Sequence, residues 1–109
     1  RTNPPGTARV GLLARGQGAF VGVLQMEPGA SVPEHRDDTE EYIHVLAGGG
    51  RMWIDDVEYE VGTGATVFMP ARAKVRFQNG DVQTTAIQVF AGPGPADKYD
   101  GWTVVASGT

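Results

Sequence analysis

The 109-residue sequence contains no cysteine, only two histidines and no long hydrophobic run. The absence of cysteine excludes disulfide bonds, thiolate metal ligands and a cysteine nucleophile, and it leaves the redox compartment open. No apolar stretch approaches the roughly 20 residues that a membrane-spanning helix needs. The first residues, RTNPPGTAR, contain neither an initial Met nor a hydrophobic signal region. We therefore expect a soluble domain without a membrane partner, in the cytoplasm or exported.

An excess of positive charge is also absent. Nine Lys and Arg residues face thirteen Asp and Glu, which gives a formal net charge of −4. Without a dense basic cluster, the chain has no means of neutralising a nucleic-acid backbone, so nucleic acid is not expected as a partner. The serines are Ser31 and Ser107, and with two histidines and no cysteine a nucleophilic triad is not expected either.

Glycine and proline, by contrast, are frequent, with 16 and 7 residues, and they punctuate the whole chain. No segment repeats apolar residues at helical spacing over three turns, which favours an all-β fold of short strands separated by turns. The length suits one domain. The predicted strands cover residues 8–14, 19–27, 40–47, 50–54, 57–61, 65–69, 74–78 and 84–90.

Alternation along the predicted strands separates inward from outward side chains. If Glu41 faces the interior, Ile43 and Val45 do so too, whereas His44 faces outward with its neighbours Tyr42 and Leu46. An outward His44 removes the second histidine that the usual two-histidine, one-carboxylate iron site requires. Oxygen-activating iron chemistry is therefore not favoured.

The segment from Gly29 to Gly48 sets His35, Asp37 and Glu41 at intervals that resemble the first motif of the cupin family. That motif runs Gly, five residues, His, one residue, His, three or four residues, Glu, six residues, Gly. Every spacing is met, but Asp37 stands where the family usually has its second histidine.

The family's second motif resembles the segment from Gly64 to Asn79. It runs Gly, five residues, Pro, one residue, Gly, two residues, His, three residues, Asn, and it is matched by Gly64, Pro70 and Asn79. Arg72 replaces the glycine, and Val75 replaces the histidine. The likeness covers roughly residues 20–92. It implies a single antiparallel jelly-roll barrel over residues 1–109, with a barrel core at about 8–92, and assembly as a homodimer. The aromatic residues of the segment 93–109 predict a C-terminal extension that packs back on the barrel.

The resemblance also implies a metal site, since the matching family positions bind metal. Here only His35, Asp37 and Glu41 can serve as ligands, because Val75 cannot bind a metal. Carboxylate ligands suit Mn, Mg or Ca, while imidazole suits Ni, Zn or Fe, so a divalent metal such as Mn, Ni, Zn or Fe is the expected cofactor. The alternative is an ordinary solvated acidic turn, since most charge runs are exposed.

Three further residues are candidates for ligand binding. Arg72 is expected near the barrel mouth, where it would bind an anion, or else on the surface as an ordinary arginine. Val75 and Phe77 face inward and would line an apolar lumen or fill the core, while Lys74 and Arg76 face outward. Two functions stay open. One is a small-molecule-binding barrel that holds a metal weakly, if at all, and the other is a metal-dependent dioxygenase, isomerase or lyase.

Overall fold

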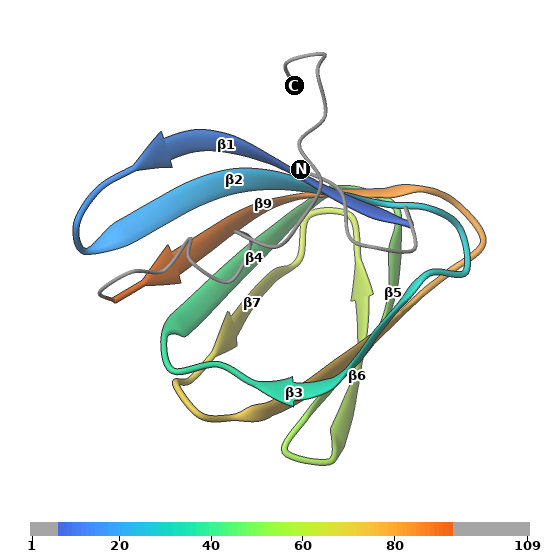
Figure 1. Cartoon of the computed structure of the whole chain (residues 1–109). Helices are drawn as coiled ribbons and strands as arrows, with labels where there is room; N and C mark the ends of the chain where they lie inside the picture. Colours follow the sequence, from blue (N-terminus) through green and yellow to red (C-terminus); the bar gives the residue numbers. More distant parts are fainter. Residues whose placement is uncertain (1–6, 93–109) are drawn as a thin grey trace.

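A computed structural model describes residues 7–92 of the chain, and in this range it contains nine β-strands and no helix (Figure 1). The all-β prediction is confirmed. No helix long and apolar enough to cross a membrane occurs in this range. The strands are β1 Ala8–Arg15, β2 Ala19–Met26, β3 Ser31–Arg36, β4 Glu40–Ala47, β5 Gly49–Ile54, β6 Val57–Gly62, β7 Thr66–Met69, β8 Lys74–Asn79 and β9 Thr84–Ala91.

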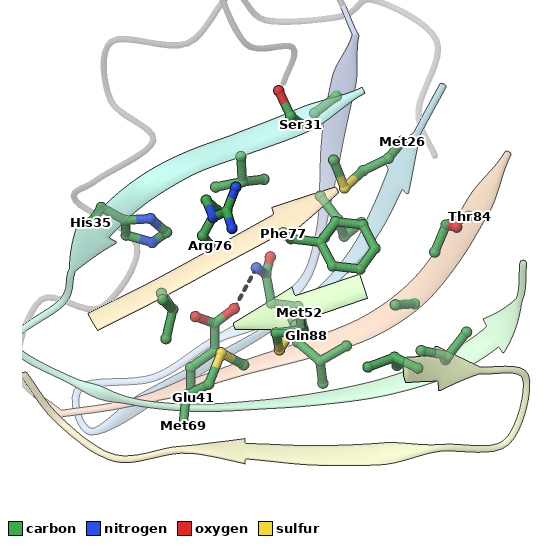
Figure 2. Close-up of a pocket in the computed structure, with 18 of the residues that line it drawn as sticks. Met26, Ser31, His35, Glu41, Met52, Met69, Arg76, Phe77, Thr84 and Gln88 are labelled. Atoms are coloured by element: carbon green, nitrogen blue, oxygen red, sulfur yellow. Dashed lines mark hydrogen bonds between the residues drawn. The ribbon is translucent and has the colours of Figure 1, made fainter. Parts of the chain in front are cut away.

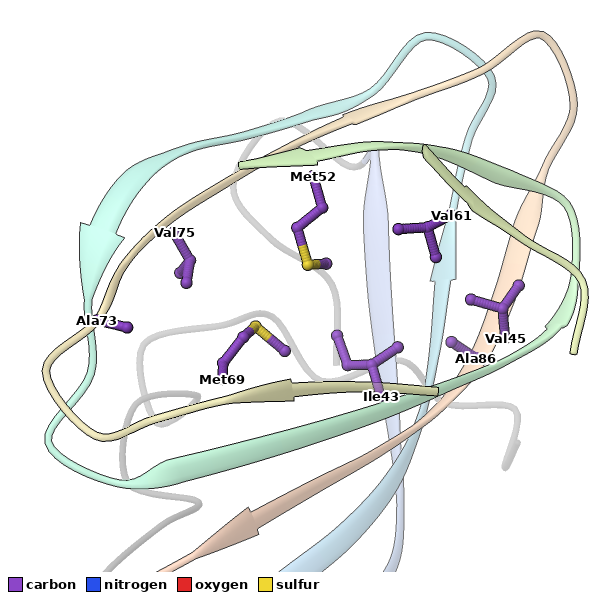
Figure 3. Close-up of a cluster of buried hydrophobic side chains, with 8 residues drawn as sticks. All are labelled: Ile43, Val45, Met52, Val61, Met69, Ala73, Val75 and Ala86. Atoms are coloured by element: carbon purple, nitrogen blue, oxygen red, sulfur yellow. The ribbon is translucent and has the colours of Figure 1, made fainter. Parts of the chain in front are cut away.

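The strands form two antiparallel sheets that face each other. The five-stranded sheet has the order β1-β2-β9-β4-β7, and the four-stranded sheet has the order β3-β8-β5-β6. Many neighbouring strands are distant in sequence, as expected for a jelly roll. The side chains between the sheets form the main core, and Figure 3 shows them pointing toward one another from both walls. This core consists of Ile43, Val45, Met52, Val61, Met69, Ala73, Val75 and Ala86.

Eight of the nine strands were predicted, with ends that agree to within one residue. The strand that was missed is β3, whose Pro33 lies mid-strand and cannot donate a hydrogen bond to a neighbour. In the structure β3 is an edge strand, and its pairing with β8 is irregular between Val32 and His35. An edge position and an irregular ladder are where a sheet tolerates proline, and β3 therefore places His35 in the barrel wall rather than in a loop.

Two turn features fix how the strands meet. Asp55 and Asp56 both have positive φ, 49° and 69°, and they connect the directly paired residues Ile54 and Val57 as a two-residue hairpin turn. Asn79, the last residue of the second motif, is buried, and its Nδ2 donates to the carbonyl oxygens of Glu27 and Val82 at 2.8 and 3.1 Å. Asn79 thus links the end of β8 to two loops.

The predictions for residues 93–109 lie outside the described residues, so the expected packing of a C-terminal extension stays a prediction. Within residues 7–92, the strands run from Ala8 to Ala91, close to the expected barrel core of 8–92.

Candidate functional site

The space between the two sheets is not completely filled. A cavity of about 450 Å³ lies inside the barrel, lined largely by aliphatic, Met and Phe side chains from both sheets (Figure 2). Val75 and Phe77 on β8 line it, as their predicted inward direction implies, together with Ile43, Val45, Met52 and Met69, and their role in ligand binding stays a prediction. Cavities of roughly 300–1,000 Å³ with apolar walls and a few polar groups are typical of small-molecule sites.

A buried carboxylate–amide pair lines one side of the cavity. Glu41 on β4 and Gln88 on β9 are each only 5% exposed, and Gln88 Nε2 donates a 2.8 Å hydrogen bond to Glu41 Oε2. The two strands are neighbours in the five-stranded sheet, which brings both side chains to the same wall. Alternation predicted that Ile43 and Val45 share the face of Glu41, and all three are buried.

The sequence analysis did not single out Gln88. The signal was present in the pattern of β9, where the inward positions carry Thr84, Ala86, Gln88 and Phe90 and all four are buried. A glutamine on the inward face of a central strand must find a hydrogen-bond partner, which points to a polar group on an adjacent strand. Glu41 is that partner.

His35 enters the same end of the cavity from β3 on the opposite sheet, as Figure 2 shows. Its Nε2 lies 3.1 Å from Asp37 Oδ2, and its Nδ1 lies 2.9 Å from the Pro33 carbonyl oxygen. Both oxygens are acceptors when Asp37 is ionised, so both contacts are hydrogen bonds only when the imidazole carries two protons. This geometry pairs both ring nitrogens of His35 with oxygens of the neighbouring chain segment.

The first motif segment thus supplies a buried carboxylate and a histidine to an apolar cavity within a two-sheet barrel. The family model for the cupin domain matches residues 22–90, well over half of the chain. The chain belongs to the cupin family. The fold and the resemblance predicted from the Gly29–Gly48 and Gly64–Asn79 segments are confirmed.

Individual relatives agree with this membership. Protein SchB from Streptomyces halstedii is 34% identical over 70 residues, a match that covers 62% of this chain and only 51% of SchB. Two solved structures with the same fold are KdgF from a Halomonas species and an RmlC-like cupin from Shewanella frigidimarina. KdgF is 13% identical, with a TM-score of 0.78, and the match covers 84% of each chain. The Shewanella protein is 16% identical, with a TM-score of 0.80, and the match covers 89% of this chain and 86% of that one.

Metal binding is common among cupins, so the expected ligands were compared with the observed geometry. Between residues 7 and 92, no group of three His, Cys, Asp or Glu side chains is placed to hold a metal ion. Glu41 bonds to Gln88 on the five-stranded sheet. His35 on β3 contacts Asp37, which directly follows that strand, on the opposite side of the lumen. The three side chains do not form a ready ligand set in this cupin, and a divalent metal stays a prediction.

Arg72 lies outside the cavity of the cupin barrel. It occupies the turn between β7 and β8 with a positive φ of 67°, and its exposed side chain pairs with the exposed Asp38 at 2.8 Å. Its backbone N–H donates to the Asp37 carbonyl oxygen at 2.7 Å, and its own carbonyl accepts from Arg36. Arg72 therefore ties the β7–β8 turn to the β3–β4 turn on the surface. Its role in ligand binding stays a prediction.

Of the residues that alternation placed outward, His44 is exposed as predicted, whereas Arg76 also borders the cavity. His44 is exposed and bonds Thr66 Oγ1 at 2.7 Å, so it faces away from His35 and the cavity. Arg76 borders the cavity with part of its side chain, but its guanidinium lies 3.8 Å from the centre of the Trp53 ring on the neighbouring strand. The hydrogen bond from Lys74 to Asp56 raises the pKa of Lys74 above its ordinary value.

Proposed function

We propose that this cupin binds an apolar small molecule inside its barrel. The observation that carries the proposal is the cavity of about 450 Å³, with apolar walls and the Glu41–Gln88 pair at one side. An apolar ligand would bury its surface against Val75 and Phe77, while the polar pair orients it.

Binding without turnover is favoured over catalysis by the state of His35. Its two ring nitrogens contact Pro33 and Asp37, so the imidazole is engaged with the protein itself. A general base or metal ligand needs a nitrogen lone pair directed at a substrate or an ion. His35 Nε2 would have to leave Asp37 before it could take either role.

The proposal is tested by filling the cavity. Val75→Phe adds bulk to the cavity wall, and we expect it to reduce the affinity for naphthalene at least tenfold, because the probe and the new ring compete for one space. The matched control is Val57→Phe on β6, since Val57 is 52% exposed and does not line the cavity. Fluorescence titration measures the affinity, and circular dichroism verifies the fold of both variants. Unchanged naphthalene binding by folded Val75→Phe would refute binding in the lumen.

A metal-dependent cupin enzyme, of the dioxygenase, isomerase or lyase class, is the second candidate function. One observation favours it. His35 Nε2 and Asp37 Oδ2 lie 3.1 Å apart. This distance falls within the range of about 2.9–3.4 Å expected between two neighbouring ligand atoms of one ion. An ion between them would replace the proton that they share, and Glu41 would complete the set only after it releases Gln88.

We also propose that the protein is a homodimer that pairs through the outer face of β4 and β7. Tyr42 and Phe68 are directly paired there, their rings lie 5.0 Å apart, and they are 38% and 46% exposed. Leu46 on β4 is also exposed. Large apolar side chains clustered on one exposed face are typical of interfaces, and a two-fold pairing would cover this patch with a second copy of itself.

A further inference from the structure

We propose that the ligand of the lumen is an amphipathic acid, whose apolar body fills the cavity and whose carboxylate binds Arg76 at an opening between β3 and β8. This assignment rests on the proposed binding function, since the apolar body must first enter the lumen. Three features of the described residues carry it: the place where the cavity meets solvent, the irregular strand pairing at that place, and the side-chain contacts of Arg76.

The cavity meets solvent along the border between β3 and β8. Of the described residues that line it, only Ser31, Pro33 and Arg76 are exposed, and all three belong to these two strands. The other described lining residues, from both sheets, are buried or half-buried. Figure 2 shows Arg76 on the β8 side of the lumen and Glu41 on the opposite wall. A ligand that fills the lumen would therefore reach water beside Arg76.

The pairing of β3 with β8 is interrupted at the same place. On β3, two residues separate the paired Val32 and His35, whereas on β8 their two partners have only Arg76 between them. One of the two β3 residues is Pro33, which has no N–H group to donate. An extra residue of this kind leaves part of the ladder unpaired, and such bulges are frequent beside binding sites because they redirect side chains. The barrel wall is thus discontinuous where Arg76 borders the cavity.

Arg76 is a cation that no acidic side chain of the protein neutralises directly. Its guanidinium carbon lies 3.8 Å from the centre of the Trp53 ring, and among residues 7–92 no carboxylate forms an ion pair with it. By contrast, Arg51 and Lys74 on the same sheet each pair with an acidic residue. Packing over an aromatic ring orients the guanidinium and leaves the N–H groups at its edge available to a carboxylate, which they can bind with two parallel hydrogen bonds.

The acidic residues near Arg76 do not take the place of this partner. Glu34 and Asp56 border a smaller hollow together with Lys74 and Arg76. Asp56 is bound to Lys74 at 2.8 Å, and Glu34 forms no ion pair with any described residue. A ligand carboxylate at the exposed guanidinium would keep part of its hydration, which avoids the cost of burying a charge among apolar side chains. An acid with an apolar body therefore fits both the lumen and its opening.

Three probes with one ring system test this class: naphthalene, 2-naphthamide and 2-naphthoate. The amide matches the carboxylate in size and shape but carries no charge. For the wild-type protein we expect 2-naphthoate to bind at least about fivefold more tightly than 2-naphthamide, because a two-fold hydrogen bond between arginine and a carboxylate is stronger than bonds to a neutral group. Isothermal titration calorimetry provides the three affinities.

Substitutions of Arg76 show whether this residue is responsible. Arg76→Gln should abolish the preference for 2-naphthoate and keep the naphthalene affinity within a few-fold. Arg51→Gln is the matched control and should keep the preference, since Arg51 is exposed on the same sheet but is not among the described residues that line the cavity. If circular dichroism shows that Arg76→Gln does not fold, Arg76→Lys retains the charge but loses the planar fork, and it should reduce the preference at least about threefold.

The outcomes separate this inference from the binding function on which it rests. Equal binding of 2-naphthoate and 2-naphthamide by the wild type, or a preference for 2-naphthoate that survives the substitution of Arg76, would overturn the inference and leave lumen binding intact. Failure of all three probes to bind would overturn both proposals.

Discussion

At the scale of single residues, the site is defined by two replacements in the cupin motifs. Asp37 occupies a position where the family usually has histidine, and it accepts from His35. Val75 occupies another such position, and β3–β8 pairing places it directly across from His35. Asp37 supplies a hydrogen-bond partner for His35. Val75 supplies an apolar side chain where the family has a metal ligand. Both changes favour an apolar lumen over a metal centre.

Restoring the family residues should therefore restore metal affinity. We predict that Asp37→His/Val75→His binds Ni²⁺ or Zn²⁺ at least about 100-fold more tightly than the wild type, because two imidazoles would join His35 near Glu41 and imidazole suits these ions. Isothermal titration calorimetry on chelator-treated protein measures the difference. Asp37→His/Val57→His is the control, since Val57 is exposed on β6. Wild-type protein that already binds one such ion per chain as tightly would instead support the metal-dependent function.

At the scale of elements, the close pairing of β5 with β6 depends on one glycine. Gly49 has a φ of 147°, and a Cβ at this position would overlap the Val61 carbonyl oxygen on the adjacent strand. Gly62, its direct partner in the ladder, has no heavy atom within 4 Å of an added Cβ. A side chain at Gly49 would therefore strain the backbone and clash with the adjacent strand, whereas a side chain at Gly62 would do neither.

The two alanine variants should consequently differ in stability. We expect Gly49→Ala to lower the free energy of unfolding by about 3 kcal/mol or more, since the clash is with backbone and cannot be relieved by a rotamer change. For Gly62→Ala the change should stay within about 0.5 kcal/mol. Urea unfolding followed by tryptophan fluorescence measures both values. Equal stability of the two variants would show that the strands separate more easily than their geometry indicates.

At the scale of the whole molecule, the side chains of β4 alternate between the cavity and the outer surface. The inward face carries Glu41, Ile43 and Val45 into the cavity, and the outward face exposes Tyr42 and Leu46. One strand thus connects the proposed ligand site to the proposed dimer interface. Substitutions on the outer face should alter assembly without changing the residues that line the lumen.

Phe68→Asp provides the test of assembly. We expect the wild type to have twice the chain mass in light scattering and Phe68→Asp to shift toward the monomer, because the charge would be buried in the interface. Val82→Asp is the control, since Val82 is 59% exposed in the segment between β8 and β9 and belongs to neither β4 nor β7. A wild-type protein that is monomeric at all working concentrations, or a Phe68→Asp variant that stays fully dimeric, would contradict the proposed interface.

The sequence by itself determined the family, eight of the nine strands and the inward direction of Val75 and Phe77. Glycine and proline mark turns locally, and a period of two assigns faces without reference to other strands. Only the tertiary structure revealed β3, whose Pro33 opposes a strand locally but is tolerated at an irregular sheet edge. It alone also paired Glu41 with Gln88, placed Arg72 beside Asp38 and left the lumen open. These features depend on which strands become neighbours and how completely their side chains fill the space between two sheets, and neither quantity is encoded in local spacing.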